Sequence, residues 1–267
     1  MRARRRGGGG RRPEPGERPR QEAHWVFGRH VVEELLVARK CRVLSFWVLT
    51  AQAKEDEDLV GKAKKLGAKV STVPKKELDR ITDGGAHQGL ALKVVERSGQ
   101  GLKEFLSGLS PQEKGGIVLV AMDQIQDPHN FGAIARGAVC LGAAALIYPE
   151  RRSAPLTQAV LSSSAGAISK IKTFPVGNLA QTLERLKEEG FWVYGADGSG
   201  KAVWDISFNR PFVLVIGSEG KGMRPLVRRY CDEIVAIPQS AKGVASLNAS
   251  CAATVLLYEA ARQAAKS

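Results

Sequence analysis

Three clusters of polar residues in the second half of the chain have the composition of a binding or catalytic site. They are Asp127–Gly132 with Arg136 shortly after it, Gly217–Gly222, and Ser246–Asn248. Each cluster follows an apolar run that predicts a buried strand. Ligands of open α/β sheets bind at the carboxyl ends of the strands, so the three clusters together predict one composite site.

Arg136 is the residue of the first cluster that local structure explains least. Asp127 and Pro128 are typical of a turn, and Asn130 is a suitable cap for the helix that follows. Arg136 falls on that predicted helix among Ala, Gly, Ile, Val and Leu, where a guanidinium needs a phosphate, a carboxylate or water. We therefore predict a functional role for Arg136.

The second cluster is a glycine-rich loop that contains a carboxylate. Its glycines allow the backbone to approach a ligand closely. Glu219 would repel an anion, which favours a neutral or cationic ligand, such as a ribose hydroxyl or a sulfonium, over a phosphate. The alternative is a tight turn in which Glu219 caps a helix that begins near Met223.

The third cluster precedes the C-terminal helix that the sequence predicts. Ser246 is a reasonable N-cap for that helix. Asn248 then falls inside the first turn, although Asn is a poor helix former. We predict that its side chain forms a hydrogen bond to a group outside the helix.

The segment Gly195–Lys201 has the spacing of a phosphate-binding loop but lacks its other requirements. Ala202 replaces the Ser or Thr whose hydroxyl would hold magnesium, and the residues after it do not open a helix. No Gly-x-Gly-x-x-Gly fingerprint follows the first strand of this unit. The sequence thus argues against nucleotide hydrolysis and against a dinucleotide cofactor.

The charge of the chain favours a polyanionic partner. The 267 residues carry a formal charge of +13, of which residues 1–22, with eight Arg and three Glu, account for +5. The rest of the chain keeps +8, and clustered cations gain free energy by releasing counterions from phosphates. Apolar runs are far shorter than the roughly 18 residues of a membrane span. The cysteines have neither zinc-ligand nor CxxC spacing and suit a reducing, intracellular setting: Cys41, Cys140, Cys231 and Cys251.

Composition divides the chain into four segments. Residues 1–22 predict a disordered basic arm, and we expect its deletion to lower the salt dependence of RNA binding. Residues 23–97 predict a small α/β domain, and residues 98–116 predict a linker with a short helix at 102–109. In residues 117–267, apolar strands alternate with amphipathic helices, which predicts a parallel sheet covered on both faces.

The expected elements follow from these patterns. In the small domain they are helices at 30–38, 58–66 and 75–80 and strands at 43–49, 68–73 and 89–95. In the larger domain the strands are 117–122, 144–148, 171–175, 191–194, 212–216 and 233–237. Its helices are 132–141, 156–165, 179–188, 224–230 and 247–265.

In this order, the three clusters resemble the signature motifs of the SpoU (TrmH) family of RNA ribose 2′-O-methyltransferases, within the SPOUT superfamily. The resemblance runs from residue 117 to about 262, on Asp127–Arg136, Gly217–Met223 and Ile237–Ser250. Residues 25–96 resemble the substrate-binding domain, related to a ribosomal RNA-binding protein, of the 23S rRNA guanosine methyltransferase branch. That segment opens at Phe27-Gly28-Arg29 and closes at His87-Gln88-Gly89.

The resemblance implies a SPOUT fold with a C-terminal trefoil knot that binds S-adenosylmethionine, in a homodimer whose protomers together form the site. Gly217, Ile237 and Leu247 would contact the cofactor. Gln239 departs from the family, which usually has Met there. The implied catalytic residues are Asn130, Arg136, Glu219, Ser246 and Asn248.

The implied activity is methyl transfer to a ribose 2′-hydroxyl of RNA in the cytoplasm, or in an organelle if the arm is a transit peptide. A guanosine of 23S rRNA is the expected target, with no DNA or membrane partner. Since a guanidinium stays protonated, Arg136 is expected to position the hydroxyl or its phosphate. The alternatives are a tRNA ribose methyltransferase and a non-catalytic rRNA-binding or ribosome-assembly protein, against which the intact catalytic set argues.

Overall fold

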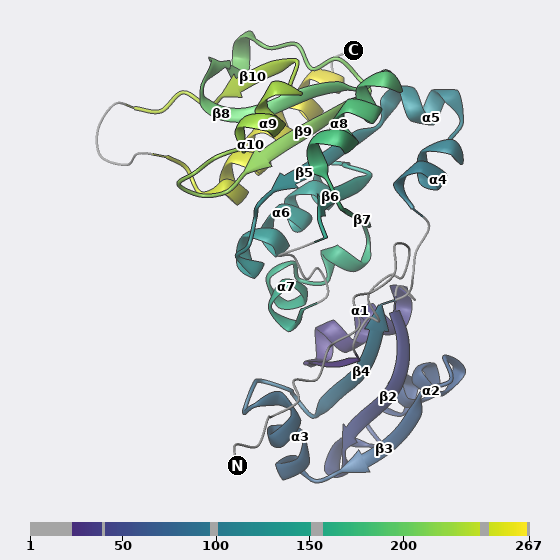
Figure 1. Ribbon diagram of the computed structural model, residues 1–267. Helices are drawn as coiled ribbons and strands as arrows, with labels where there is room; N and C mark the ends of the chain where they lie inside the picture. The colour runs from purple at the N-terminus through teal and green to yellow at the C-terminus, as the bar shows by residue number, and fades with distance from the viewer. Residues whose placement is uncertain (1–22, 39–40, 97–100, 151–156, 241–245, 266–267) are drawn as a thin grey trace, which may run out of the picture.

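The computed structural model shows two α/β units, of which the larger carries all three polar clusters and lies at the top of Figure 1. The predicted basic arm, residues 1–22, lies outside the described residues. None of the helices in the described part of the chain is long and apolar enough to cross a membrane. The described residues are 23–38, 41–96, 101–150, 157–240 and 246–265.

The small unit is a four-stranded sheet in the order β1-β4-β2-β3, in which β3 is parallel to β2 and the other pairs are antiparallel. Helices α1 and α2 pack on one face of this sheet, whereas α3 covers part of the other, and Figure 1 shows α2 and α3 on opposite sides. The elements are β1 (His24–Phe27), α1 (Arg29–Ala38), β2 (Cys41–Leu49), α2 (Glu57–Lys65), β3 (Lys69–Val73), α3 (Lys75–Thr82) and β4 (Leu90–Glu96). The sequence did not predict β1, because so short a strand is defined by its pairing with β4.

The larger unit is a six-stranded sheet in the order β10-β8-β9-β5-β6-β7, with every pair parallel. Its strands are β5 (Val118–Asp123), β6 (Ala145–Pro149), β7 (Lys172–Val176), β8 (Trp192–Ala202), β9 (Phe212–Gly217) and β10 (Glu233–Ala236). Its helices are α6 (Pro128–Cys140), α7 (Gln158–Ser163), α8 (Leu179–Glu188), α9 (Pro225–Arg229) and α10 (Ala249–Ala264). Short 3₁₀ turns are η2 (Ala167–Ser169) and η3 (Val203–Asp205) in this unit and η1 (Thr50–Gln52) in the small unit.

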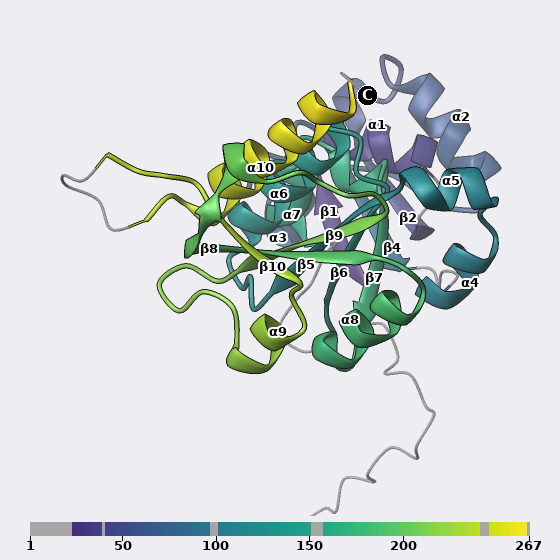
Figure 2. The same cartoon turned by 90° about the horizontal axis from the view of Figure 1, so that it is seen from above.

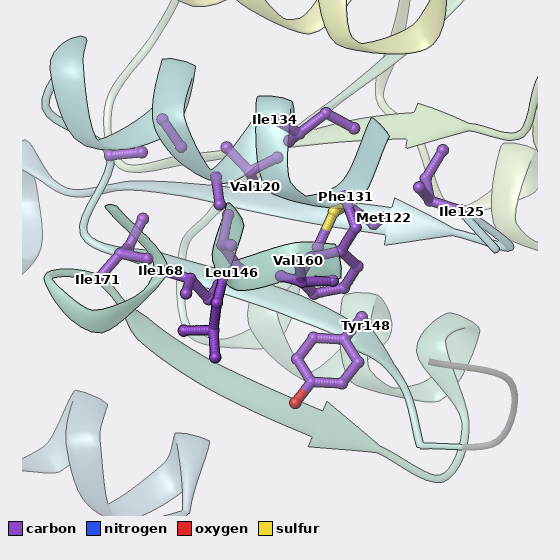
Figure 3. Close-up of a cluster of buried hydrophobic side chains, with 14 of the residues drawn as sticks. Val120, Met122, Ile125, Phe131, Ile134, Leu146, Tyr148, Val160, Ile168 and Ile171 are labelled. Carbon is purple, nitrogen blue, oxygen red and sulfur yellow. The ribbon is translucent and has the colours of Figure 1, made fainter. Parts of the chain in front are cut away.

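Helices cover both faces of this parallel sheet, which confirms the predicted architecture. Figure 2 shows α6 and α10 on one side and α8 and α9 on the other. Side chains of β5 alternate between the two cores: Val120 and Met122 pack under α6, and Leu119 and Ala121 face α8. On the α6 side, Phe131 meets Tyr148 edge to face, with ring centroids 5.3 Å apart (Figure 3). The buried apolar run of β5 therefore determines where the strand ends, and with it where the first polar cluster begins.

Two elements differ from the sequence prediction in extent. Strand β8 runs on to Ala202, because Lys201 and Ala202 pair with Val235 and Ala236 of β10 after a shift of register. The predicted linker contains α4 (Leu102–Ser107) and also α5 (Pro111–Gly116), which a capping box at Ser110 and Glu113 starts. Helix α4 packs on the larger unit, where Phe105 lies 5.2 Å from Phe174 between ring centroids.

The two units are joined by polar contacts as well as by the chain. The side-chain amide of Gln158 accepts a hydrogen bond from the backbone N–H of Phe27 at 2.8 Å and donates one to its carbonyl at 3.0 Å. Glu34 on α1 pairs with Lys170 at 3.0 Å and accepts a hydrogen bond from Ser169. These contacts fix the small unit against α7 and η2.

The sheet topology places the polar clusters at a switch point. From β5 the chain moves to β6 on one side, whereas from β9, the other neighbour of β5, it moves toward β10 at the opposite edge. The final residues of β5 and β9, Asp123 and Gly217, are paired in register. Crevices form where adjacent strands connect in opposite directions, and this is where ligands bind in such sheets.

Candidate active site

Asn130 lies inside helix α6 and does not cap it, contrary to the sequence prediction. The helix begins at Pro128, and Asp127 is its N-cap, accepting a hydrogen bond from the backbone N–H of His129 at 3.0 Å. Pro at the first helical position favours this earlier start. As a result, Asn130 is buried and its side chain is available for a tertiary contact.

The tertiary partner of Asn130 is Glu219, from the second cluster. Asn130 donates a hydrogen bond from Nδ2 to Glu219 Oε1 at 3.0 Å. Asn248, from the third cluster, donates from its own Nδ2 to Asn130 Oδ1 at 2.8 Å and also to Glu219 Oε1. One residue from each cluster therefore joins a single network, as a composite site requires. The carboxylate of Glu219 is held through one oxygen.

Asn248 is the N-cap of α10, so the prediction that Ser246 caps this helix was wrong. Its Oδ1 accepts hydrogen bonds from the backbone N–H groups of Ser250 at 2.9 Å and Cys251 at 3.3 Å. Because the oxygen caps the helix, the amide nitrogen must point toward Glu219. The expected bond outside the helix does exist, and the cap orients it.

An ion pair with a buried carboxylate connects the end of β5 to the residues that follow the glycine loop. Asp123 is fully buried, and Arg224 donates to it from its backbone N–H at 2.7 Å and from Nε at 2.8 Å. The Nη2 of Arg224 is a further 2.7 Å contact. This pair was not predicted from the sequence. Its available signal was an Asp at the end of an otherwise apolar strand.

The glycine loop folds back on itself directly after β9. Ser218 and Gly222 exchange two backbone hydrogen bonds, of 3.1 Å and 2.9 Å. A Cβ on Gly217 would lie 2.3 Å from the carbonyl carbon of Gly222 and from the nitrogen of Met223, and neither backbone atom can move aside. Glycine is thus required at 217, because any side chain there would prevent the start of the loop from packing against the backbone of Gly222 and Met223.

We predict that Gly217→Ala opens this loop and lowers cofactor affinity by about 5- to 150-fold, because overpacking of this kind costs roughly 1–3 kcal/mol. Cofactor titration by calorimetry measures the loss. The matched control is Gly177→Ala, since a Cβ there meets no atom within 4 Å. Equal affinity of Gly217→Ala and the control would contradict the prediction.

A cleft of about 240 Å³ lies between the glycine loop, the ends of β8 and β10, and the start of α10. Its apolar wall includes Ile216, Val235 and Leu256. The predicted cofactor residues Gly217, Ile237 and Leu247 all line it, and so do Glu219 and Ser246. Gln239 also lines it, whereas residues 241–245 lie outside the described residues.

A second cleft, of about 340 Å³, adjoins the first. It lies between the loop after β5 and the glycine loop, and Asn130 and Lys221 are part of its wall. Ser218 and Glu219 line both clefts, so the network around Glu219 stands at their junction. Gln124, also in this wall, has a left-handed backbone with φ of 63°, a strained conformation of the kind that clusters at functional sites.

Arg136 lines neither cleft. It is exposed on α6 and forms no ion pair with any residue that the structure describes. Six helical residues correspond to roughly 600° of rotation, so Arg136 points roughly 120° away from Asn130. The structure thus brings Asn130, Glu219 and Asn248 together, places Ser246 nearby and leaves Arg136 on an outer face.

Part of Gly195–Lys201, the segment with phosphate-loop spacing, lines the first cleft. Ala196, Asp197 and Gly198 line the cleft from β8, and Lys201 pairs with Glu233 of β10. Hydrogen bonds from Ser199, with help from Arg228, lower the pKa of Asp197. Asp197 is a second carboxylate of the cleft that the sequence analysis did not identify.

Cys231 lies behind the glycine loop, where its thiol is buried. It lies beside Met223 with an S···S distance of 4.0 Å. Burial raises the pKa of its thiol to about 12. Since the thiolate is the nucleophilic form, Cys231 is unsuited to covalent catalysis.

Two family models match the chain. Residues 117–258 match the SpoU rRNA Methylase family, and residues 25–99 match the RNA 2′-O ribose methyltransferase substrate-binding family. The chain is 37% identical over 245 residues to YacO of Bacillus subtilis, named for the TrmH family of tRNA/rRNA methyltransferases, covering 91% of this chain and 97% of that protein. It is 37% identical over 242 residues to a Pseudomonas syringae protein named 23S rRNA (guanosine-2′-O-)-methyltransferase RlmB, covering 89% and 95%.

Solved structures have the same fold. The SpoU methyltransferase AviRb of Streptomyces viridochromogenes, in complex with the cofactor AdoMet, superposes with a TM-score of 0.77 at 24% identity, over 92% of this chain and 91% of that one. An AdoMet-bound rRNA methyltransferase from Sinorhizobium meliloti gives 0.75 at 23% identity, over 90% and 87%.

Proposed function

The chain belongs to the SpoU rRNA methylase family and is an RNA methyltransferase, and from this we propose that it methylates the ribose 2′-hydroxyl of a guanosine in large-subunit rRNA. The methyl donor is S-adenosylmethionine. The active site is the junction of the two clefts, and the reaction takes place in the cytoplasm, where rRNA is available. The observation that carries the proposal is the network of Asn130, Glu219 and Asn248 where the clefts meet.

The first cleft suits S-adenosylmethionine by its chemistry. An adenine ring needs an apolar wall, which Ile216, Val235 and Leu256 provide. A sulfonium needs nearby negative charge, and Glu219 and Asp197 supply carboxylates. When bound, this cofactor supplies an electrophilic methyl group. Gly217, Ile237 and Leu247 would hold it, largely through the backbone of the loops.

The second cleft suits the ribose and phosphate of the target nucleotide. Lys221 provides a cation for a phosphate, and Glu219 provides a carboxylate oxygen for a ribose hydroxyl. Because Asn130 and Asn248 donate to Glu219 Oε1, they orient the carboxylate and leave Oε2 to accept a hydrogen bond from the hydroxyl. Holding that hydroxyl at the junction of the clefts supplies the proximity that the transfer requires.

Arg136 completes this site when a second copy of the chain covers the outer surface of α6 and α10. We define the α6–α10 face as Ala133, Arg136, Cys140, Cys251, Val255 and Tyr258. The helices pack closely here, since a Cβ on Gly137 would lie 2.8 Å from Thr254 Oγ1. Val255 and Tyr258, one turn apart on α10, are 40% and 59% exposed, and together they form an exposed apolar patch. A homodimer through this face would bury both and would carry Arg136 to a composite site.

We expect Tyr258→Asp to convert the dimer to a monomer and to abolish methyl transfer, because a buried carboxylate without a partner is costly at an interface. Light scattering gives the mass, and a methyl-transfer assay gives the activity. The matched control is Val37→Asp, at a 69% exposed position on α1. A variant that stays dimeric, or an active monomer, would refute the role of this face.

The relatives named as 23S rRNA guanosine methyltransferases and the presence of the small domain both support rRNA over tRNA as substrate. The test is incubation with labelled S-adenosylmethionine and separate pools of unmodified 23S rRNA and tRNA, followed by mapping of the labelled nucleotide. Labelling of a ribose in 23S rRNA is the expected result. Labelling of tRNA alone would overturn the rRNA assignment, and no transfer to either pool would overturn the activity.

A further inference from the structure

One face of the small unit's sheet is only partly covered. Helices α1 and α2 bury the face that carries Phe46, Leu92 and Val94. On the other face, α3 covers one end through Leu78, which packs with Val73 and Ala91. The remaining part of that face, formed by the middle of β1, β4, β2 and β3, we call the open sheet face.

Two tryptophans lie side by side on the open sheet face. Trp25 of β1 and Trp47 of β2 have ring centroids 4.7 Å apart and an angle of 53° between their planes. Both are half-buried. Lys93 of β4 pairs in register with Trp25, and its Nζ lies 5.9 Å from the centroid of that ring, within cation–π range.

Cations surround the tryptophan pair. Lys93 and Ser45 are neighbours in register, and Ser45 pairs with Lys69 of β3, which is exposed. Arg42, also exposed, pairs with Val95 on the same face. Among the described strand residues of this face, none is Asp or Glu, and no ion pair within the described chain neutralises these three cations.

Packing explains only part of this arrangement. Trp25 and Trp47 shield the small cluster around Leu78 and Ala91, which accounts for their apolar contacts. Shielding does not require three cations without acidic partners on the same face. Aromatic rings beside Lys and Arg are the composition of a surface that stacks unpaired bases and contacts their phosphates.

We propose that the open sheet face binds a single-stranded segment of the RNA substrate, with one base stacked on the Trp25–Trp47 pair and with phosphates on Arg42, Lys69 and Lys93. This deepens the proposed function, on which it rests, by giving the small unit a defined RNA-binding surface away from the clefts.

Tryptophan fluorescence tests the stacking directly. In the double variant Trp192→Phe and Trp204→Phe, only Trp25 and Trp47 report, because these are the four tryptophans of the chain. Saturation with poly(U) is expected to quench the emission strongly, whereas a poly(A)·poly(U) duplex quenches it little. Binding is followed independently with labelled RNA. Unchanged emission when poly(U) is fully bound would overturn the proposal.

Variants test the contribution to affinity. Trp25→Leu keeps an apolar side chain against α3 and is expected to weaken poly(U) binding by about 10-fold, the effect of losing one stacked base. Trp204→Leu, at a 66% exposed position of the larger unit, is the matched control and should leave affinity unchanged. Lys93→Gln should lower the slope of log affinity against log salt by about 0.7, and Lys103→Gln on α4 should not.

The outcomes separate this surface from the catalytic proposal. If Trp25→Leu loses its thermal unfolding transition, Lys93→Gln and the fluorescence quenching decide the question. If both Trp25→Leu and Lys93→Gln bind poly(U) like the wild type while rRNA is still methylated, the open sheet face is excluded and the proposed function stands. If poly(U) quenches the tryptophans but no RNA is methylated, the surface stands and the proposed function fails.

Discussion

Replacing Arg136 by alanine is expected to lower methyl transfer to RNA by about 10²–10³-fold, the size of the effect when one positioned donor of a reacting oxygen is lost. Affinity for S-adenosylmethionine should stay unchanged, because Arg136 lines neither cleft of its own chain. Single-turnover methyl transfer and calorimetric titration of the cofactor measure the two quantities.

Two controls sharpen the result for Arg136. Arg185→Ala removes an exposed Arg from α8, on the opposite side of the sheet, and should retain full activity. Arg136→Lys keeps the charge but loses the planar pair of donors, so it should recover only a small part of the rate. Full turnover by Arg136→Ala would remove this residue from the mechanism, and a parallel loss of cofactor affinity would assign it to binding.

Replacing Arg224 by alanine is expected to destabilise the larger unit by about 3 kcal/mol, because it leaves the buried carboxylate of Asp123 without its charged partner. Asp123 has no exposed side-chain surface, whereas the Arg224 side chain is 42% exposed. The reverse change, Asp123→Asn, should therefore cost less, since water can solvate the released guanidinium. Urea unfolding monitored by circular dichroism measures both.

A larger loss of unfolding free energy in Arg224→Ala than in Asp123→Asn would identify the Asp123–Arg224 pair as structural. Arg228→Ala is the matched control, because Arg228 pairs with the partly exposed Asp197. Removing Arg228 therefore leaves no buried carboxylate without a partner. Comparable free energies of unfolding for Arg224→Ala and Arg228→Ala would show that the ion pair contributes no more than a surface contact.

The sequence predicted the sheet well because its strands are long apolar runs. For β5 and β9 the runs end where the strands end, at Asp123 and Gly217, so the position of the polar clusters followed. For β8 the end of the apolar run did not mark the end of the strand. Its second half is rich in Gly, Asp, Ser and Lys, and the pairing of Lys201 and Ala202 with β10, which no local pattern reveals, carries the strand to Ala202.

The roles of individual site residues were predicted with less success than the sheet. These roles depend on hydrogen-bond partners that lie far away in the sequence. Propensity made Asn130 and Ser246 the caps, whereas Asp127 and Asn248 cap the two helices. The bond from Asn130 to Glu219 spans 89 residues. The roles of these residues stay predictions. So does the trefoil knot, since residues 241–245, between β10 and α10, lie outside the described part of the chain.

The contact of Gln158 with Phe27 has a consequence for the solubility of the protein. β1 is an edge strand, and the carboxamide of Gln158 bonds the N–H and C=O of Phe27, at the end of that strand, as a neighbouring peptide group would. Unpaired edges invite pairing with other chains. Separation of the two units would therefore expose this part of the β1 edge to pairing with another chain, so the docking of the units also covers a sheet edge.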